Sequence, residues 1–233
     1  MDTVSSGKKT ARIAGLFYLL YISASIISEA MGHFVFEEAG ETVEYLIGHG
    51  TAFRAGILVA LFSGVLFLIA AWALNVLLSK INREAALLLF LLNLAGFVIW
   101  CISLSHLFSA ADLLSGAYSE VFTPEELKAQ AMVFINSRKT GAAIAQIPYS
   151  LWLLPLGYLI YKSDFIPRIF GVFLFADAVG LLLYLSQELV FPFCNLISYP
   201  SFLISFIAEV SLACWLLLIG VKKGDPESAL ITR

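Results

Sequence analysis

The stretch Gly157-Tyr-Leu-Ile-Tyr-Lys-Ser-Asp-Phe-Ile-Pro-Arg-Ile-Phe-Gly-Val-Phe173 decides the fold of this chain. An apolar segment ends in Lys162, a short polar turn follows, and Pro167 opens the next apolar segment with Arg168 directly behind it. Because proline is favoured at the first position of a helix, the pattern predicts one helix ending near Lys162 and another beginning near Pro167. The two basic residues therefore mark a membrane surface from which two hydrophobic helices depart.

The composition of the whole chain agrees with a membrane protein. It has 233 residues, of which 60% are hydrophobic and 13% are charged, whereas a soluble domain has roughly 25% charged residues and about 45–50% apolar ones. One globular core cannot bury this excess, so lipid must solvate much of the surface. A net charge of −3 indicates no nucleic-acid partner, and three widely spaced cysteines form neither a disulfide framework nor a CxxC pair.

Six apolar stretches are long enough to cross about 30 Å of hydrocarbon as helices. We expect them at residues 11–35, 52–79, 84–114, 140–162, 167–189 and 199–221. No strand pattern or repeat interrupts them, and polar tails occupy residues 1–10 and 223–233. The sequence therefore predicts an all-α, polytopic membrane protein with one six-helix transmembrane domain over residues 11–222.

The polar intervals carry two further expectations. Residues 36–50 read as an acidic connection between the first two spans. Between the third and fourth spans, Thr123-Pro124-Glu125-Glu126 is a helix-start signal, and apolar residues recur on one face after it. We therefore expect an amphipathic interfacial helix at residues 124–137. Pro148 and Pro155 are expected to bend the fourth span.

The distribution of basic residues predicts the orientation. Six spans place both termini on one side, and ten basic residues gather there: Lys8, Lys9, Arg12, Lys80, Arg83, Lys162, Arg168, Lys222, Lys223 and Arg233. The other side receives four: Arg54, Lys128, Arg138 and Lys139. The positive-inside rule then predicts a cytoplasmic-membrane protein with both termini in the cytoplasm. A cleaved signal peptide ending at Ser28-Glu29-Ala30 is an alternative that leaves five spans and the same charge bias.

Four blocks of sequence resemble a known family. They are Ala11-Arg-Ile-Ala-Gly-Leu-Phe-Tyr-Leu-Leu20, Phe53-Arg-Ala-Gly-Ile57, the stretch Gly157–Gly171, and Ala208-Glu-Val-Ser-Leu-Ala-Cys-Trp-Leu-Leu-Leu-Ile-Gly-Val221. Together, over about residues 10–222, they resemble the prokaryotic membrane-protein family described as domain of unknown function 4386. The resemblance implies an all-helical membrane protein and no established activity. It also implies that the charges of Arg54 and Glu209 are frequent in the family, whereas the histidine expected near Arg138 is absent here.

Two acids lie deep within the predicted spans. Asp177 in the fifth span and Glu209 in the sixth are roughly 15–20 Å from the predicted cytoplasmic surface at 1.5 Å per residue. Consecutive antiparallel helices usually pack together, so the two carboxyls are expected to face each other. One of them should then keep its proton at neutral pH, because burial and a neighbouring like charge both disfavour ionisation. A proton or cation relay and a hydrogen bond that only joins two helices both remain open.

Two polar stripes extend this pattern. Asp177, Gly180, Tyr184 and Glu188 follow helical spacing on the fifth span, as Tyr18, Ser25, Glu29 and His33 do on the first. Such stripes point into a bundle or a water-filled cavity. Both stripes end in the outer half of their spans, so we expect an outer vestibule that contains Glu29, His33, Arg54, His106 and Glu188. Arg54 is expected to be the counter-ion of Glu29 or Glu188.

Metal and cofactor signals are weak. Glu29 and His33 are one helical turn apart and could share a metal with His106 or His49, but no HExxH pair is present. Phosphate loops, the GxSxG elbow, the CxxCH haem motif and a basic–aromatic nucleic-acid surface are absent from the sequence. The sequence therefore assigns no metal and no cofactor, and it predicts no nucleic-acid partner.

Three functions remain open. The first is a small transport or ligand-binding membrane protein with an outer polar cavity leading to Asp177 and Glu209, whose partners are the bilayer and a small molecule or ion. The second is a non-catalytic accessory or assembly protein. The third is an intramembrane enzyme acting on a lipid-like substrate, with Glu29, His33 and His106 as acid/base groups or metal ligands.

Overall fold

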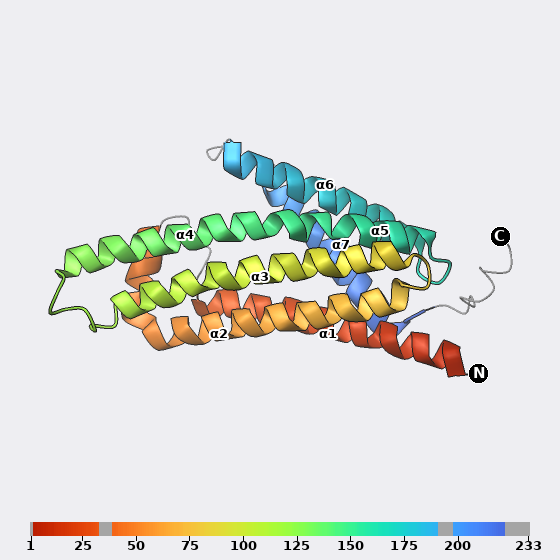
Figure 1. The fold of residues 1–233 in the computed structure, drawn as a ribbon, viewed down its shortest axis with the longest axis horizontal. Helices are drawn as coiled ribbons and strands as arrows, with labels where there is room; N and C mark the ends of the chain where they lie inside the picture. Colours follow the sequence, from red (N-terminus) through yellow and green to blue (C-terminus); the bar gives the residue numbers. More distant parts are fainter. Residues whose placement is uncertain (1, 33–38, 191–197, 222–233) are drawn as a thin grey trace. The chain divides into compact units, whose positions relative to one another are not determined.

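The protein folds as a set of helices (Figure 1). The computed structural model describes residues 2–32, 39–190 and 198–221, and describes no side chains for residues 2–6, 188–190 and 198–202. Within these residues no strand occurs. The helices are α1 (Asp2–Gly32), α2 (Ala39–Leu78), α3 (Arg83–Leu113), α4 (Pro124–Leu151), α5 (Leu153–Lys162), α6 (Arg168–Val190) and α7 (Ser198–Leu218). The predicted all-α class is confirmed.

The helices are long and apolar enough for a polytopic membrane protein. In the part of the chain that the structure describes, five helical stretches meet the length and hydropathy expected of a span: Gly7–Gly32, Ala39–Leu78, Arg83–Leu113, Pro124–Lys162 and Arg168–Gln187. A shorter apolar helix, Leu203–Leu218, follows. The turn that the sequence predicted around Ser163 is present, because α5 ends at Lys162 and α6 begins at Arg168.

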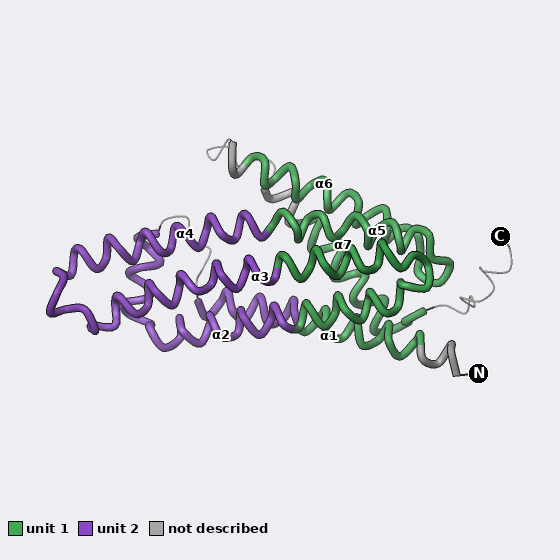
Figure 2. The backbone as a smooth tube through the Cα atoms, in the orientation of Figure 1, with its two compact units in different colours: residues 1–20, 66–96, 146–233 green, residues 21–65, 97–145 purple. Residues whose placement is uncertain are grey.

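Contacts divide the chain into two compact units (Figure 2). Unit 1 consists of Met1–Leu20, Leu66–Gly96 and Gln146–Arg233, and unit 2 of Tyr21–Val65 and Phe97–Ala145. Helices α1 to α4 each contribute to both units. Within unit 1, the beginning of α1, the α2–α3 turn and the α5–α6 turn lie at one end (Figures 1 and 2).

Glycines allow close helix contacts inside unit 1. Gly157 of α5 and Gly171 of α6 face each other, since a Cβ atom on Gly171 would lie 2.7 Å from the Gly157 carbonyl oxygen. On α1, a Cβ atom on Gly15 would lie 2.5 Å from the Leu217 backbone nitrogen of α7. In lipid the hydrophobic effect does not drive helices together, so small residues at such crossings stabilise the contact by letting the two backbones pack closely. The centre of unit 1 holds large buried side chains, among them Trp152.

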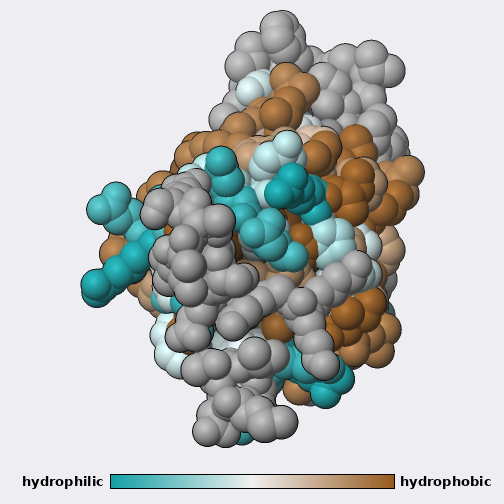
Figure 3. Space-filling model, turned by 90° about the vertical axis from the view of Figure 1, so that its right-hand side faces the viewer, coloured by the Kyte–Doolittle hydropathy of each residue, from teal (hydrophilic) through white to brown (hydrophobic). Residues whose placement is uncertain are grey.

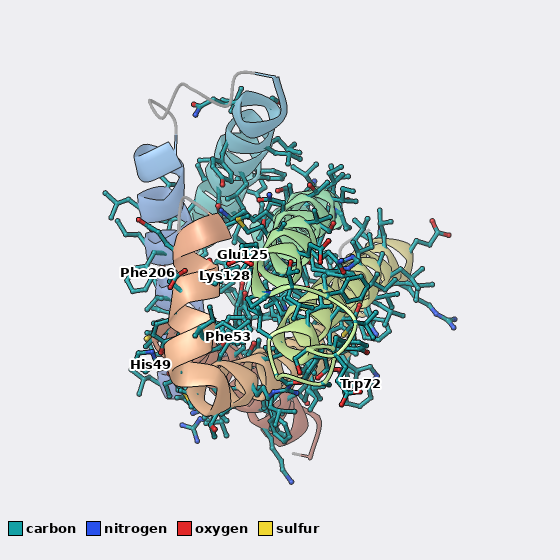
Figure 4. All side chains as sticks on the ribbon, turned by 90° about the vertical axis from the view of Figure 1, so that its left-hand side faces the viewer. His49, Phe53, Trp72, Glu125, Lys128 and Phe206 are labelled. Carbon is teal, nitrogen blue, oxygen red and sulfur yellow. The ribbon has the colours of Figure 1, made fainter. Side chains whose placement is uncertain are left out.

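Unit 2 has its own hydrophobic core. Its buried members come from α2, α3 and α4: Val43, Leu46, Phe53, Ile57, Ala60, Leu104, Leu107, Ala110, Ala111, Ala131 and Ile135. Phe53 is fully buried there (Figure 4). Outside the core, Lys128 Nζ lies 3.0 Å from Glu44 Oε1 and joins α4 to α2. Since both side chains are largely exposed, this pair contributes about 1 kcal/mol or less.

The segment expected as a separate interfacial helix is continuous with the fourth span. Its start is as predicted: the Thr123 N–H donates to Glu126 Oε2 at 2.8 Å, and the Glu126 N–H donates to the Thr123 hydroxyl oxygen at 3.3 Å. This reciprocal capping box fixes α4 at Pro124. The boundary expected at residues 137–140 is absent, because α4 continues unbroken from Pro124 to Leu151. Within it the side-chain hydroxyls of Ser137 and Thr140 donate to carbonyls four residues earlier.

The prolines of the fourth span cause a local interruption, where the sequence predicted a bend. Helices α4 and α5 meet at Trp152, whose backbone angles remain helical at φ −64° and ψ −25°. The Trp152 N–H still donates to the Pro148 carbonyl, and the Leu156 N–H to the Trp152 carbonyl. Pro155 has no N–H to offer the Leu151 carbonyl, so one helical hydrogen bond is missing at this point. Helices α4 and α5 thus form one nearly continuous rod.

The connection expected at residues 36–50 is helical from Ala39 onward. Helix α2 contains a kink at His49, whose φ of −133° and ψ of 34° are not helical (Figure 4). Gly48 and Gly50 flank the kink, and the His49 ring stacks on Tyr45 with ring centroids 4.5 Å apart. The Tyr45 hydroxyl in turn donates to the Met31 carbonyl of α1. These contacts hold in place a helical turn whose acidic composition suggested a loop.

We predict that Gly171→Ala destabilises the protein. The new methyl group would meet the Gly157 backbone, which cannot rotate away, and overpacking of this kind costs about 1–3 kcal/mol. Gly7→Ala on α1 is the control, because nothing lies within 4 Å of its Cβ position. Thermal denaturation in detergent should show a lower Tm for Gly171→Ala alone. Equal Tm values for both variants would contradict the close contact.

Candidate functional site

A cluster of polar side chains joins α1, α6 and α7 inside unit 1. The Tyr18 hydroxyl donates to Glu209 Oε2 at 2.8 Å, and the Ser205 hydroxyl donates to Glu209 Oε1 at 3.3 Å. Asp177 is close enough for its charge to act on Glu209, and the Ser205 hydroxyl is a polar neighbour of both carboxyls. The structure thus brings together the two acids that the sequence placed at mid-membrane depth.

Asp177 is the most constrained member of this acid cluster. Its side chain is 0% exposed, and neither carboxyl oxygen accepts a well-formed hydrogen bond from the described residues. Asp177 is about nine residues from the start of α6, and Glu209 about nine from the end of α7, so each lies about 14 Å along its helix. A buried ionised carboxylate without partners is very costly. Asp177 is therefore the acid of this cluster whose burial is least compensated by hydrogen bonds.

Aromatic packing fixes the Tyr18 hydroxyl on Glu209. The Tyr18 side chain is 0% exposed, and its ring lies 5.5 Å from the Phe67 ring and 6.1 Å from the Trp152 ring. Phe67 and Trp152 meet edge to face at 4.9 Å, and the Tyr149 ring lies 5.6 Å from Phe67. With the ring enclosed in this way, the hydroxyl has little freedom to leave Glu209.

The polar stripe on α6 continues beyond Asp177. Tyr184 is two turns further along the helix and half-buried. Glu188 belongs to the same helix, but its side chain lies outside the described residues. Asp177 and Tyr184 share a face at i, i+7 spacing, as the sequence indicated.

A second polar group lies in unit 2, around Arg138 of α4. The Arg138 side chain is only 7% exposed, and its guanidinium carbon lies 5.2 Å from the centroid of the Trp100 ring. The charge of the half-buried Glu29 acts on Arg138 across the α1–α4 contact. A buried cation over an aromatic face and near a carboxylate is a stabilised arrangement. Arg138 is thus a cation that interacts electrostatically with Glu29.

Helix α3 supplies the remaining polar residues of this group. The Ser103 hydroxyl donates to the Arg138 carbonyl at 2.7 Å, and a Cβ atom on Gly141 would lie 2.9 Å from Ser103 Cβ. His106, one turn further along α3, is half-buried, with its ring 6.1 Å from the Phe134 ring. The α3–α4 contact therefore places His106 and Arg138 on neighbouring helices within unit 2.

Arg54 has a different partner from the one the sequence suggested. Its guanidinium Nη2 donates to Asp112 Oδ1 at 2.8 Å and to the Ala111 carbonyl at 3.1 Å. Asp112 and Ala111 lie in the last turn of α3, where the helix dipole also attracts a cation. The sequence predicted Glu29 or Glu188 as the partner of Arg54. Among the described side chains its ion pair is with Asp112 instead of Glu29, and the Glu188 side chain lies outside them.

The proposed metal ligands are not brought together in the described residues. No group of three His, Cys, Asp or Glu side chains within them could hold a metal ion. His49 Nδ1 instead lies 3.3 Å from the Tyr45 carbonyl, and His33 lies outside the described residues. Of the expected vestibule, Glu29, Arg54 and His106 belong to unit 2 and Glu188 to unit 1.

Sequence reasoning missed Ser205 and Arg138. Ser205 precedes Glu209 by one helical turn, and a serine at i−4 from an intramembrane acid is a natural donor to it. Arg138 follows the buried Ala131 and Ile135 at helical spacing. Extending the apolar face of residues 124–137 by one more position would have placed Arg138 on the buried side.

Comparison with known proteins identifies one family. The sequence model of the family described as Domain of unknown function (DUF4386) matches residues 13–220. No curated protein sequence and no solved structure shows significant similarity to the chain.

We predict that Tyr18→Phe destabilises unit 1 by about 0.6–1.7 kcal/mol, the range of interhelical hydrogen bonds in membranes. The ring and its packing remain, so the loss reports the hydroxyl donated to Glu209. Tyr158→Phe is the matched control, since Tyr158 is exposed on α5 in the same unit. A double-mutant cycle of Tyr18→Phe with Glu209→Gln, measured by chemical denaturation in detergent, should show coupling. Additive effects would contradict it.

We also predict that Arg138→Gln costs more stability than Arg54→Gln. Removing the buried cation leaves Glu29 without its partner, at a cost of about 2 kcal/mol or more, whereas the exposed pair of Arg54 contributes about 1 kcal/mol or less. Denaturation midpoints of the two variants provide the measurement. Adding Glu29→Gln to Arg138→Gln should restore part of the loss, and no recovery would contradict the pairing.

Proposed function

The chain belongs to the DUF4386 family, whose description names no activity, and from its side chains we propose that it is a small transport or ligand-binding protein of the cytoplasmic membrane. In this proposal it takes up a proton at Asp177 and Glu209. The observation that carries this proposal is the complete burial of Asp177, whose carboxyl oxygens lack hydrogen-bond partners in the described residues, beside a second acid. Ionisable residues inside spans are costly and mark ion or proton pathways.

The geometry supports proton transfer between the two acids. Ser205 is a polar neighbour of both carboxyls. A hydroxyl both donates and accepts, so Ser205 can accept the Glu209 proton while its own proton passes to Asp177. Tyr18 stabilises the Glu209 carboxylate that remains. One proton is thereby transferred from Glu209 to an ionised Asp177, so that one acid is ionised before and after the transfer and the two are never ionised at the same time.

A separate polar site is proposed within unit 2. Glu29, Arg138 and His106 supply an acid, a cation and an imidazole on three neighbouring helices, a donor set suited to a small polar ligand or ion. The positive-inside rule supports cytoplasmic termini, because the beginning of α1 and the α2–α3 and α5–α6 turns, which carry basic residues, lie at one end of unit 1.

A second candidate is an accessory or assembly protein. The hydrogen bond from Tyr18 to Glu209 favours it, because this bond joins the first helix to the last and would stabilise the fold in the absence of any flux. The two candidates differ in what the loss of Asp177 does, since Asp177 makes no such bond.

We expect Asp177→Asn to abolish proton uptake while the fold remains stable, because an amide keeps the shape of the carboxyl but carries no titratable proton. The assay is proton movement across the membrane of reconstituted liposomes that contain a pH-sensitive dye and are driven by a pH gradient. Asp164→Asn is the matched control: Asp164 is exposed in the α5–α6 turn and pairs with Arg168.

The thermal stability of both variants separates the two candidates. Loss of proton movement in Asp177→Asn at an unchanged Tm supports a proton site. Proton movement in Asp177→Asn equal to that of the wild type, or none in the wild type, contradicts the proposed function. In that case a reduced Tm for Glu209→Gln favours the accessory role.

A further inference from the structure

The basic end of unit 1 contains a pocket that the proposed proton site does not use. The pocket has a volume of about 360 Å³ and is lined by Lys8, Lys9, Arg12, Ile13, Leu16 and Leu217. All three cations are exposed, and the remaining lining is apolar. In the space-filling view of this side of the molecule, hydrophilic residues lie next to hydrophobic ones (Figure 3).

The position of the pocket along α1 matches a lipid headgroup region. Arg12 is the last charged residue before the long apolar run of α1, which continues uncharged to Glu29. Lys8 and Lys9 are one turn nearer to the chain end, and Ile13 and Leu16 are on the hydrocarbon side. The cations therefore lie where phosphates are found, and the apolar residues where acyl chains begin.

The end of α7 closes the pocket against α1. Gly220 has a φ of +72°, a conformation that glycine adopts without strain, and a Cβ atom there would lie 3.1 Å from Lys8 Cγ. The turn after α7 thus packs directly on the Lys8 stem. On α1 itself, a Cβ atom on Gly15 would meet the backbone at Leu217. Two tight contacts therefore shape the pocket without any ligand.

We infer that this pocket binds an anionic phospholipid, with the phosphate among Lys8, Lys9 and Arg12 and the first acyl methylenes on Leu16 and Leu217. Arginine holds phosphate oxygens with two parallel N–H groups, and lysine acts as a compact charge beside them. Free phosphate satisfies only the cations, whereas a phospholipid also covers the apolar half of the lining. The three positive charges of the pocket disfavour cationic ligands. Its position at the level of the lipid headgroups favours a lipid.

The test compares lipid binding by the full-length protein with that by two triple variants of equal charge. The first, Lys8→Gln/Lys9→Gln/Arg12→Gln, removes the pocket cations. The second, Lys80→Gln/Arg83→Gln/Lys162→Gln, removes exposed cations from the other turns at the same end of unit 1. Binding is measured by native mass spectrometry and by the Tm increase on adding phosphatidylglycerol to phosphatidylcholine nanodiscs. Each basic residue near an anionic surface contributes appreciably to the binding free energy. The pocket variant should therefore bind phosphatidylglycerol at least about tenfold more weakly than the wild type.

Three outcomes decide the inference. Weaker phosphatidylglycerol binding by the pocket variant alone, with the same Tm in pure phosphatidylcholine, supports the site. Equal weakening in both triple variants overturns it, because diffuse surface charge then explains the binding. Competition by inorganic phosphate or glycerol phosphate as strong as that by the lipid overturns the lipid assignment. Leu16→Gln distinguishes the sources independently, since it should weaken lipid binding and leave phosphate binding unchanged.

Discussion

Hydrocarbon offers no hydrogen-bond partner, and this constraint governs where the polar side chains of unit 1 lie. Glu209 is tolerated because Tyr18 and Ser205 donate to its two oxygens. Tyr18 can donate only because Phe67 and Trp152 enclose its ring. Close helix contacts at Gly15 and at the Gly157–Gly171 pair bring these side chains within reach. Asp177 is the exception, because it is buried without well-formed hydrogen bonds from the described residues. It is therefore the residue on which the proposed function rests.

A second requirement arises because α2 and the α4–α5 pair, which contribute to both units, are longer than a bilayer is thick. At about 1.5 Å per residue, the 40 residues of α2 extend for about 60 Å along their kinked path, against about 30 Å of hydrocarbon. Helix α4 with α5 is similarly long. The excess turns bury apolar side chains against one another and carry the ion pairs of Arg54 and Lys128. Water can reach these pairs, whereas Arg138 is buried and depends on Trp100 and Glu29.

Much of the fold was predictable from the sequence, because span boundaries are set by local features. Pro167 and the flanking Lys162 and Arg168 mark the α5–α6 turn, and Thr123 with Glu126 marks the start of α4. The depth of Asp177 and Glu209 follows from counting residues. Partner choice was not predictable in this way. Arg54 pairs with Asp112, 58 positions along the chain, because the rotation of α3 about its axis decides which carboxylate faces it. Similarly, hydropathy alone predicts that the acidic segment beginning at Ala39 is a connecting loop. The hydrogen bond from Tyr45 to Met31 that holds this segment is a tertiary contact, which the local sequence does not reveal.

The separation of Tyr18 and Glu209 by 191 positions has a consequence for biogenesis. Unit 2 consists of residues 21–65 and 97–145, so all its segments have left the ribosome once α4 is made. Unit 1 needs α7 before the Tyr18 hydroxyl of α1 gains its Glu209 acceptor. During translation α1 must therefore stay in the bilayer without this partner until α7 is inserted. Insertion of α7 then closes the contacts that join α1, α6 and α7 in unit 1.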